Sequence, residues 1–273
     1  MFDHAQTLDG ATHGAPSDTI AFARQQVEDC ALGQAAWTRE TAAFVRPDIP
    51  GYSIVREIHR GGQGVVYEAI QDHPHRRVAI KFLRDGIASS RADLLRFRRE
   101  ADILGRVRHP NIVTIYEAGV ASGSQYFVMD YIAGLPLDVH VRDAALSVEE
   151  TVRLFATICD AVSAAHQHGV LHRDLKPSNI LVDERGQPHV LDFGLAVDTH
   201  GADSSVTITG QFIGSLPWAS PEQAAGDSDK TDVRTDVYAM GLILFHMLTE
   251  RFPYEVVGSP STVLDSIQSA EPI

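Results

Sequence analysis

The chain has 273 residues, 44% of them apolar and 22% charged, a composition typical of a globular protein with one large domain or two lobes. Its formal net charge of −13, with no basic block, argues against non-specific nucleic-acid binding, and its two cysteines are too few for a disulfide framework. The N-terminus lacks a signal-peptide layout, and no apolar run approaches the roughly 18 residues of a membrane span. We therefore expect a cytoplasmic chain, and leave a membrane anchor beyond residue 273 open.

Residues 1–50 differ from the rest of the chain. They are mostly small and polar and show no strand pattern, and a helix starting near Ser17 or Asp18 would have only a thin apolar stripe. We predict a flexible or weakly helical N-terminal extension over residues 1–50, with a regulatory helix as the alternative. Pro47 and Pro50 mark its end.

From residue 52 the apolar pattern changes to that of short strands around one helix. The helix, predicted over residues 89–107, carries apolar residues at spacings of three and four. Together these elements indicate a small, mostly β unit. The predicted strands cover residues 52–58, 65–70, 77–83, 112–118 and 125–129.

A glycine-rich turn, Arg60-Gly61-Gly62-Gln63-Gly64-Val65-Val66, joins the first two strands. Glycines let a backbone approach phosphates closely, although such a turn alone is as often a plain hairpin. The next strand contains Val78-Ala79-Ile80-Lys81. An ammonium at the end of this apolar strand needs a carboxylate partner, and Glu100 lies at the edge of the apolar stripe of the following helix.

The second half is mainly helical after a break at residues 134–136. Ser147 is predicted to cap a long helix that ends near residues 168–169, with Glu149 and Glu150 in its first turn. Short strands are expected at residues 180–182 and 190–191. Further helices are predicted over residues 235–249 and near 261–268, so the whole chain indicates an α+β fold.

Chemistry is concentrated in His172-Arg173-Asp174-Leu175-Lys176-Pro177-Ser178-Asn179, followed by Asp192-Phe193-Gly194. Asp174 can accept a hydrogen bond from an attacking hydroxyl, and Lys176 can balance developing charge. Asn179 and Asp192 offer the oxygen ligands that Mg²⁺ prefers. The chain has only three lysines, and two of them, Lys81 and Lys176, lie where phosphoryl transfer needs an ammonium.

In these motifs, and in their order from about Tyr52 to the C-terminus, the chain resembles bacterial eukaryotic-like (Hanks-type) serine/threonine protein kinases. The resemblance implies a two-lobed protein-kinase-like fold, with a small, mostly β N-lobe over about 51–131 and a larger helical C-lobe over about 132–273. Because such kinases continue with further helices, it also implies a fold that is truncated at its C-terminus.

The resemblance implies transfer of the ATP γ-phosphate to Ser or Thr hydroxyls of protein substrates, with ATP and Mg²⁺ as cofactors. The family pattern begins its loop with a glycine where this chain has His59, which we expect to stiffen the loop or alter ATP affinity without abolishing binding. The implied catalytic residues are Lys81, Glu100, Asp174 and Lys176, and the implied metal ligands are Asn179 and Asp192. The implied nucleotide contacts are Gly61, Gly62, Gly64, Val66, Ala79, Lys81, Met129, Asp130, Ile132 and Leu181.

Residues 192–222 resemble an activation segment. Phosphate on Thr207 or Thr209 would place negative charge beside Arg173 and order this loop, and self-association would permit the reaction in trans. By the same resemblance, Asp236 accepts backbone hydrogen bonds from the catalytic loop.

Two rival interpretations remain. A nucleotide-binding pseudokinase scaffold would usually lack a lysine, base or metal ligand, and only His59 favours it. A small-molecule phosphotransferase would not need residues 214–222, which shape a peptide-binding surface in the family. His166, His168 and His172 lack an accompanying carboxylate or cysteine set, so we do not expect them to bind a metal.

Overall fold

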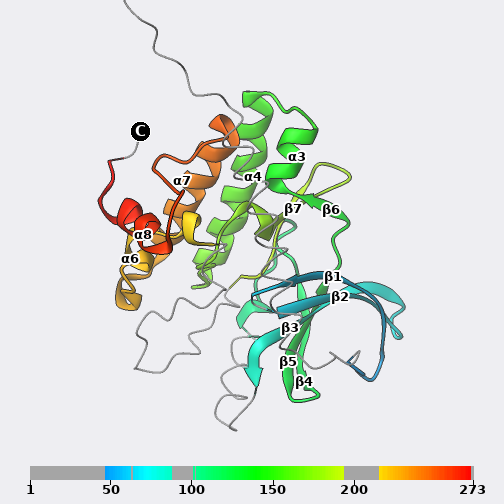
Figure 1. The fold of residues 1–273 in the computed structure, drawn as a ribbon. Coiled ribbons are helices and arrows are strands. Elements are labelled where there is room, and N and C mark those ends of the chain that lie inside the picture. The colour runs from blue at the N-terminus through cyan, green and yellow to red at the C-terminus, as the bar shows by residue number, and fades with distance from the viewer. Residues whose placement is uncertain (1–46, 63, 88–100, 102, 194–214, 272–273) are drawn as a thin grey trace, which may run out of the picture.

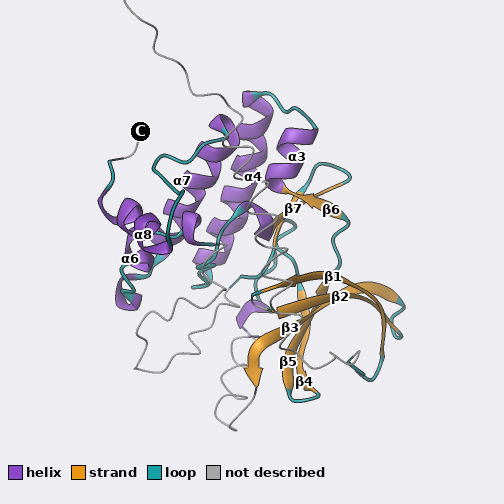
Figure 2. Cartoon of the chain, viewed as in Figure 1, coloured by secondary structure: helices purple, strands orange, loops and turns teal. Residues whose placement is uncertain are grey.

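The structure, a computed structural model, describes residues 47–62, 64–87, 101, 103–193 and 215–271. A β-rich part and a larger, mainly helical part lie side by side (Figures 1 and 2). The β-rich part is a five-stranded sheet in the order β1-β2-β3-β5-β4, and every neighbouring pair is antiparallel. Its strands are β1 (Tyr52–Gly61), β2 (Gly64–Gln71), β3 (Arg76–Ile87), β4 (Ile115–Ala121) and β5 (Ser124–Asp130).

Alternation along the strands divides this sheet into two apolar faces. One face, the outer cluster, is closed by Ile49, which precedes β1 and is only 2% exposed. The opposite face carries Ala79, Phe127 and Met129 and belongs to a different cluster. The members of the outer cluster on the strands are Val65, Tyr67, Ala69, Val78, Ile80, Phe82, Tyr126 and Val128.

The helical part contains a second, three-stranded antiparallel sheet in the order β6-β7-β8. Its strands are β6 (Gly134–Pro136), β7 (Ile180–Asp183) and β8 (Pro188–Val190). The helices are α3 (Leu137–Asp143), α4 (Val148–Gln167), α6 (Pro221–Ala224), α7 (Val233–Thr249) and α8 (Pro260–Ser269). Single turns of 3₁₀ helix occur at η1 (Pro177–Asn179), η2 (Leu216–Trp218) and η3 (Ser228–Lys230).

The long helix α4 has the start and end that its sequence predicts. The Ser147 side chain accepts the Glu150 N–H, and the Glu150 carboxylate accepts the Ser147 N–H in return, which forms a capping box. The helix buries a stripe at spacings of three and four, and Gly169 follows its end with φ 73°. The buried stripe is Thr151, Phe155, Ile158, Ala161, Val162 and Ala165.

The inner face of the five-stranded sheet shares one apolar cluster with the helical part, here called the shared core. It begins at Ala79, Phe127 and Met129 and continues through α4 residues such as Ile158 to Ile243 on α7. A smaller cluster under α6, α7 and α8 contains Leu216, Ala224, Leu242, Tyr254, Val263 and Ile267. The two parts of the chain are therefore joined by continuous apolar packing as well as by backbone.

Three elements differ from the prediction. The strand predicted from residue 112 begins at Ile115, and Ile112 makes only an isolated parallel bridge to Val190. The predicted break at residues 134–136 is the short strand β6, because pairing with β7 outweighs its turn-like composition. The helix α3, which the sequence did not indicate, follows directly from Pro136.

Two predictions fall wholly or largely outside the described residues. Residues 1–46 of the expected N-terminal extension are not described. Of the helix predicted over 89–107, residues 101, 103 and 104 are helical, residues 105 and 106 form a turn, and residue 107 belongs to no element.

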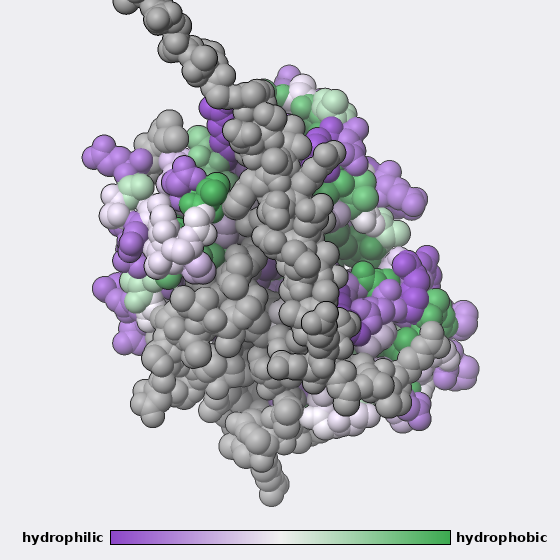
Figure 3. Space-filling model, viewed as in Figure 1, coloured by the Kyte–Doolittle hydropathy of each residue, from purple (hydrophilic) through white to green (hydrophobic). Residues whose placement is uncertain are grey.

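Among the described residues, no helix has both the length and the apolar character that crossing a bilayer requires. In the view of Figure 3, hydrophilic and hydrophobic side chains of the described residues are interspersed. The exposed large apolar residues come from many elements, including Val55, Val120, Val148 and Val237.

Removing the α4 cap gives a direct test of the helix start. We expect Ser147→Ala to lower the free energy of unfolding by about 1 kcal/mol, because it leaves backbone N–H groups of the first turn without their acceptor. Urea unfolding followed by circular dichroism measures this. Ser163→Ala, at an exposed position within α4, is the matched control and should cause no loss, since alanine is the better helix former. Equal unfolding midpoints for both variants would contradict the capping role.

Candidate active site

The loop between α4 and η1 is held by one buried carboxylate on α7. Asp236 is 1% exposed, and its oxygens accept the backbone N–H groups of His172 and Arg173, each at 2.8 Å. His166 Nε2 contacts the same carboxylate at 2.8 Å. Because Arg173 has φ 67°, a left-handed conformation unfavourable for this residue type, these bonds maintain a strained backbone. The expected role of Asp236 is confirmed.

The fully buried His172 connects this loop to the segment that carries Asp192. Its Nδ1 accepts the Asp174 N–H at 3.3 Å, so its Nε2 carries the proton and donates to the Leu191 carbonyl at 2.7 Å. Its ring lies 4.9 Å from that of Phe193. Burial lowers the pKa of His172 below its ordinary value, although the nearby Asp236 and Asp174 carboxylates act in the opposite direction. The residue is therefore a neutral structural connector.

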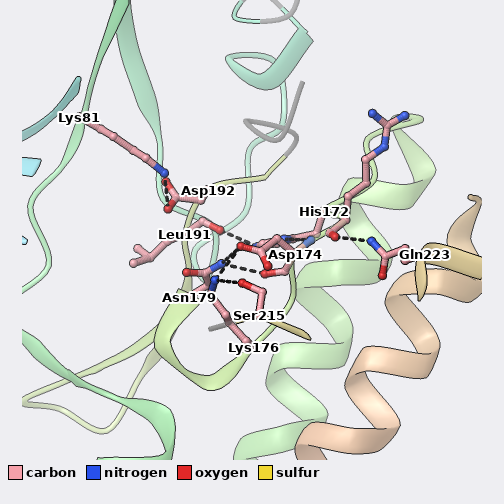
Figure 4. A network of polar contacts seen from close by, with 10 residues as sticks. Lys81, His172, Asp174, Lys176, Asn179, Leu191, Asp192, Ser215 and Gln223 are labelled. Atoms are coloured by element: carbon pink, nitrogen blue, oxygen red, sulfur yellow. Dashed lines mark hydrogen bonds and ion pairs between the residues drawn. The ribbon is translucent and has the colours of Figure 1, made fainter. Parts of the chain in front are cut away.

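Three of the predicted catalytic and metal-binding side chains, which come from this loop and from η1, lie close together (Figure 4). Lys176 Nζ donates to Asp174 Oδ2 at 2.8 Å and to Ser215 Oγ at 2.6 Å. Asn179 Nδ2 donates to the Asp174 carbonyl at 2.7 Å and to Asp174 Oδ2 at 3.2 Å. Burial alone would raise the pKa of Asp174, but the Lys176 ammonium holds it below its ordinary value. Asp174 is therefore an ionised acceptor at neutral pH.

Across from this group, Lys81 of β3 forms an ion pair with Asp192. Lys81 Nζ lies 2.7 Å from Asp192 Oδ2, and the two side chains are 5% and 17% exposed. Both charges are largely removed from water, and their mutual attraction offsets part of the cost of burying them. The predicted partner of Lys81, Glu100, lies outside the described residues. The sequence suggested Asp192 only as a metal ligand, so its contact with Lys81 is an addition.

The side chains predicted to enclose the adenine come from both sheets. Val66 faces Lys81 across β2 and β3, and Ala79 faces Met129 across β3 and β5. Ile132, just after β5, packs against the shared core. Leu181 on β7 is half-buried between the fully buried Ile180 and Val182, so it faces the opposite side of its sheet.

The predicted loop glycines differ in how strongly the backbone requires them. At Gly64, φ is 151° and an added Cβ would lie 1.8 Å from the Phe82 carbonyl oxygen, so no other residue fits. At Gly61 the three atoms nearest to an added Cβ all belong to the His59 ring, the nearest at 2.9 Å. Gly62 is described, whereas Gln63 is not.

The segment at residues 130–132 is fixed by Asp130. Its N–H donates to the Thr114 carbonyl at 3.1 Å, and its carboxylate accepts the Thr114 N–H at 2.9 Å and the Tyr116 hydroxyl. An adenine contact from Asp130 would therefore use its carbonyl group. Beside this segment the Arg77 guanidinium stacks on the Tyr131 ring at 4.2 Å and donates to the buried Glu68.

Sequence reasoning missed two polar side chains that support the catalytic loop. Ser215 accepts from Lys176, and Gln223 of α6 donates its Nε2–H to the Arg173 carbonyl at 2.7 Å. The Gln223 oxygen also accepts the Ser220 N–H, which completes a capping box. The Ser-x-x-Gln spacing was visible in the sequence, but the contact across fifty residues was not. Gly194 and the predicted phosphorylation sites Thr207 and Thr209 lie outside the described residues.

Comparison with known families decides what this arrangement is. The model of the protein kinase domain matches residues 52–271, which covers both sheets and the helices described above. The chain belongs to the protein kinase family. Members of this family use ATP and a divalent metal.

The names of individual relatives agree with this family assignment. A probable serine/threonine-protein kinase PknB of Lactococcus lactis is 37% identical over 223 residues, which are 81% of this chain and 35% of the relative. The serine/threonine-protein kinase PrkC of Bacillus subtilis is 38% identical over 222 residues, 81% of this chain and 34% of the relative. The chain thus spans about a third of the length of these relatives.

Among solved structures, the kinase domain of Mycobacterium tuberculosis PknI aligns with a TM-score of 0.62 at 25% identity, covering 85% of this chain and 83% of that one. The expected α+β, two-lobed kinase fold is confirmed.

The neutral His172 makes stability depend on pH. Its folded pKa lies below the ordinary value of 6.5, so between the two values the unfolded chain binds more protons. Its contribution is complete above about pH 6.5 and decreases as the pH falls, by at most about 1.4 kcal/mol per pH unit. Urea unfolding between about pH 7.5 and pH 5 should show this slope, and His172→Gln should reduce it. A slope unchanged by the substitution would contradict the assignment.

Gln223→Glu separates the capping function of Gln223 from its contact with the catalytic loop. Glutamate preserves the capping box but cannot donate to the Arg173 carbonyl. We expect kcat for phosphoryl transfer to fall roughly 10-fold, on the scale of one lost hydrogen bond. The thermal midpoint should stay close to that of the exposed control Gln268→Glu. An unchanged kcat would mean that this bond does not position the loop.

Proposed function

We propose that this chain is a serine/threonine protein kinase that transfers the γ-phosphate of ATP to Ser or Thr hydroxyls of protein substrates. The observation that carries the proposal is the convergence of Asp174, Lys176 and Asn179, joined by hydrogen bonds of 2.7–3.2 Å, opposite the Lys81–Asp192 pair. Phosphoryl transfer requires mainly positioning and charge neutralisation, and these five side chains supply both.

Asp174 is the group that orients the acceptor. As an ionised carboxylate with a lowered pKa, it can accept the hydrogen of a Ser or Thr hydroxyl and take its proton as the bond to phosphorus forms. Lys176 already donates to Asp174 and to Ser215, so its ammonium can stabilise charge on the transferred group with little movement. A lysine two residues after the base is typical of the Ser/Thr class of the family.

The proposed ATP site lies between the glycine-rich loop and Leu181. Val66 and Ala79 would cover the adenine, the backbone of Gly61, Gly62 and Gly64 would approach the phosphates, and Lys81 would hold the α- and β-phosphates. The character of these residues suits ATP, because an apolar surface that can cover the base lies beside a buried ammonium that can bind phosphate, on the same face of the sheet.

The residues present also fit Mg²⁺. The Asn179 amide nitrogen donates to Asp174, which directs its oxygen away from that residue and makes it available as a ligand, and Asp192 supplies a carboxylate. Within the described part of the chain no group of three or more His, Cys, Asp or Glu side chains could bind a metal. This donor set suits Mg²⁺, which is usually held by one or two protein ligands together with phosphates and water. When bound, Mg²⁺ neutralises phosphate charge.

We further propose that the kinase is activated by autophosphorylation on Thr207 or Thr209. Arg173 supports this, since it precedes the candidate base and its backbone is fixed by Asp236 and Gln223. A phosphothreonine beside its guanidinium would form charge-assisted hydrogen bonds. Self-association of two copies would allow the transfer to occur in trans.

Mass spectrometry after incubation with Mg·ATP tests this function. We expect phosphate on Thr207 or Thr209, and Asp174→Asn should slow its appearance by at least about 100-fold, the scale of a lost general base. Asp160→Asn, on the exposed surface of α4, is the matched control and should react as the unaltered chain does. If the chain binds ATP but phosphorylates neither itself nor a basic protein substrate, the function proposed here is wrong and a nucleotide-binding scaffold replaces it.

A further inference from the structure

His59 occupies the one position at which the glycine-rich loop departs from the family pattern. It lies near the end of β1 opposite Val66, and Val66 lies opposite Lys81 on the next strand. Directly opposed residues of an antiparallel sheet extend their side chains from the same face. His59, Val66 and Lys81 therefore form one row across the face that the proposed nucleotide site occupies.

The His59 ring leans along this face toward the tip of the loop. Its Nε2 lies 2.9 Å from the place where a Cβ on Gly61 would be, so the ring fills the space above that glycine. A side chain at position 61 would displace the ring. The imidazole therefore lies next to Val66, on the side nearer to the loop glycines. The family pattern has a glycine at position 59, which offers only backbone atoms there.

The electrostatic surroundings agree with this location. Loss of hydration lowers the pKa of His59 first, and the Lys81 ammonium lowers it further, while Asp192 acts in the opposite direction. The residue as a whole is nevertheless exposed. A neutral imidazole has one N–H donor and one acceptor nitrogen, so it can hydrogen-bond a hydroxyl group in either direction.

We propose that the His59 imidazole hydrogen-bonds the ribose of bound ATP and so contributes to nucleotide specificity. This inference rests on the proposed function, which assigns the base to Val66 and the phosphates to Lys81 and the loop glycines. The ribose joins the base to the phosphates, so it must lie between these two sets of residues. From its place beside Val66, the His59 ring extends toward Gly61, so it spans the space between the proposed contacts of the base and those of the loop glycines with the phosphates.

Binding measurements with sugar-modified nucleotides test the contact. Titration calorimetry would compare Mg·ATP with its 2′-deoxy and 3′-deoxy analogues on the unaltered chain, His59→Gly, His59→Phe and His75→Ala. Glycine restores the family residue, and phenylalanine keeps the ring without its hydrogen-bonding atoms. His75, exposed in the turn between β2 and β3, is the matched control.

We expect the unaltered chain and His75→Ala to prefer ATP over at least one analogue by roughly 2- to 10-fold, the scale of one hydrogen bond. His59→Gly and His59→Phe should bind ATP more weakly by the same factor and lose the preference. In turnover assays the change should appear in KM for ATP, with kcat altered by less than about 2-fold.

Several results would overturn this contact. A preference that persists in His59→Gly, or one that His59→Phe retains, would show that the ring makes no polar contact with the sugar. Equal weakening for ATP and both analogues, or tighter binding by His59→Gly, would also refute it. Thermal melting confirms that each variant is folded. Failure of the proposed function is recognised separately, because an inactive chain that binds nucleotide still reports on His59, whereas a folded chain that binds no ATP refutes both.

Discussion

A single buried carboxylate organises the catalytic side of the molecule. Asp236 satisfies two consecutive backbone N–H groups of the loop that precedes the candidate base, and it also contacts His166 at the end of α4. Without these acceptors the left-handed conformation of Arg173 would relax, because few residues other than glycine adopt it without cost. The position of Asp174 therefore depends on Asp236 of α7. The other buried residues of this helix are mainly apolar and pack in the interior.

The opposite side of the site depends on the two faces of one sheet. The outer cluster fixes β2, β3 and β5 relative to one another. The side chains on the inner face therefore lie in rows that run across the strands. The Lys81 side chain extends from one such row and is buried, and its ammonium forms an ion pair with Asp192. The ion pair connects the sheet to the segment after β8, and His172 connects that segment to the catalytic loop. A chain of polar contacts thus runs from β3 to α7.

Much of this could be predicted from the sequence, because the relevant signals are local. Alternating apolar residues indicated the strands, the Ser147–Glu150 spacing indicated the start of α4, and the motif at residues 172–179 indicated the chemistry. The remaining features depend on contacts between distant residues. The strand β6 exists because β7 pairs with it, and the catalytic support from Ser215 and Gln223 arises from segments about forty and fifty residues away. Local pattern contains no information about such partners.

The shared core has a consequence for how the two lobes move and unfold. Ala79, Phe127 and Met129 of the sheet are packed in the same apolar cluster as Ile158 of α4 and Ile243 of α7. Opening the lobes widely would expose this surface to water, so motion between them should proceed by small sliding of packed side chains. Each lobe also has an apolar cluster of its own, but the cluster that joins them contains residues of both. Heating should disrupt both lobes in one cooperative transition, and a lobe transplanted from a relative would need its half of this cluster matched to the other half.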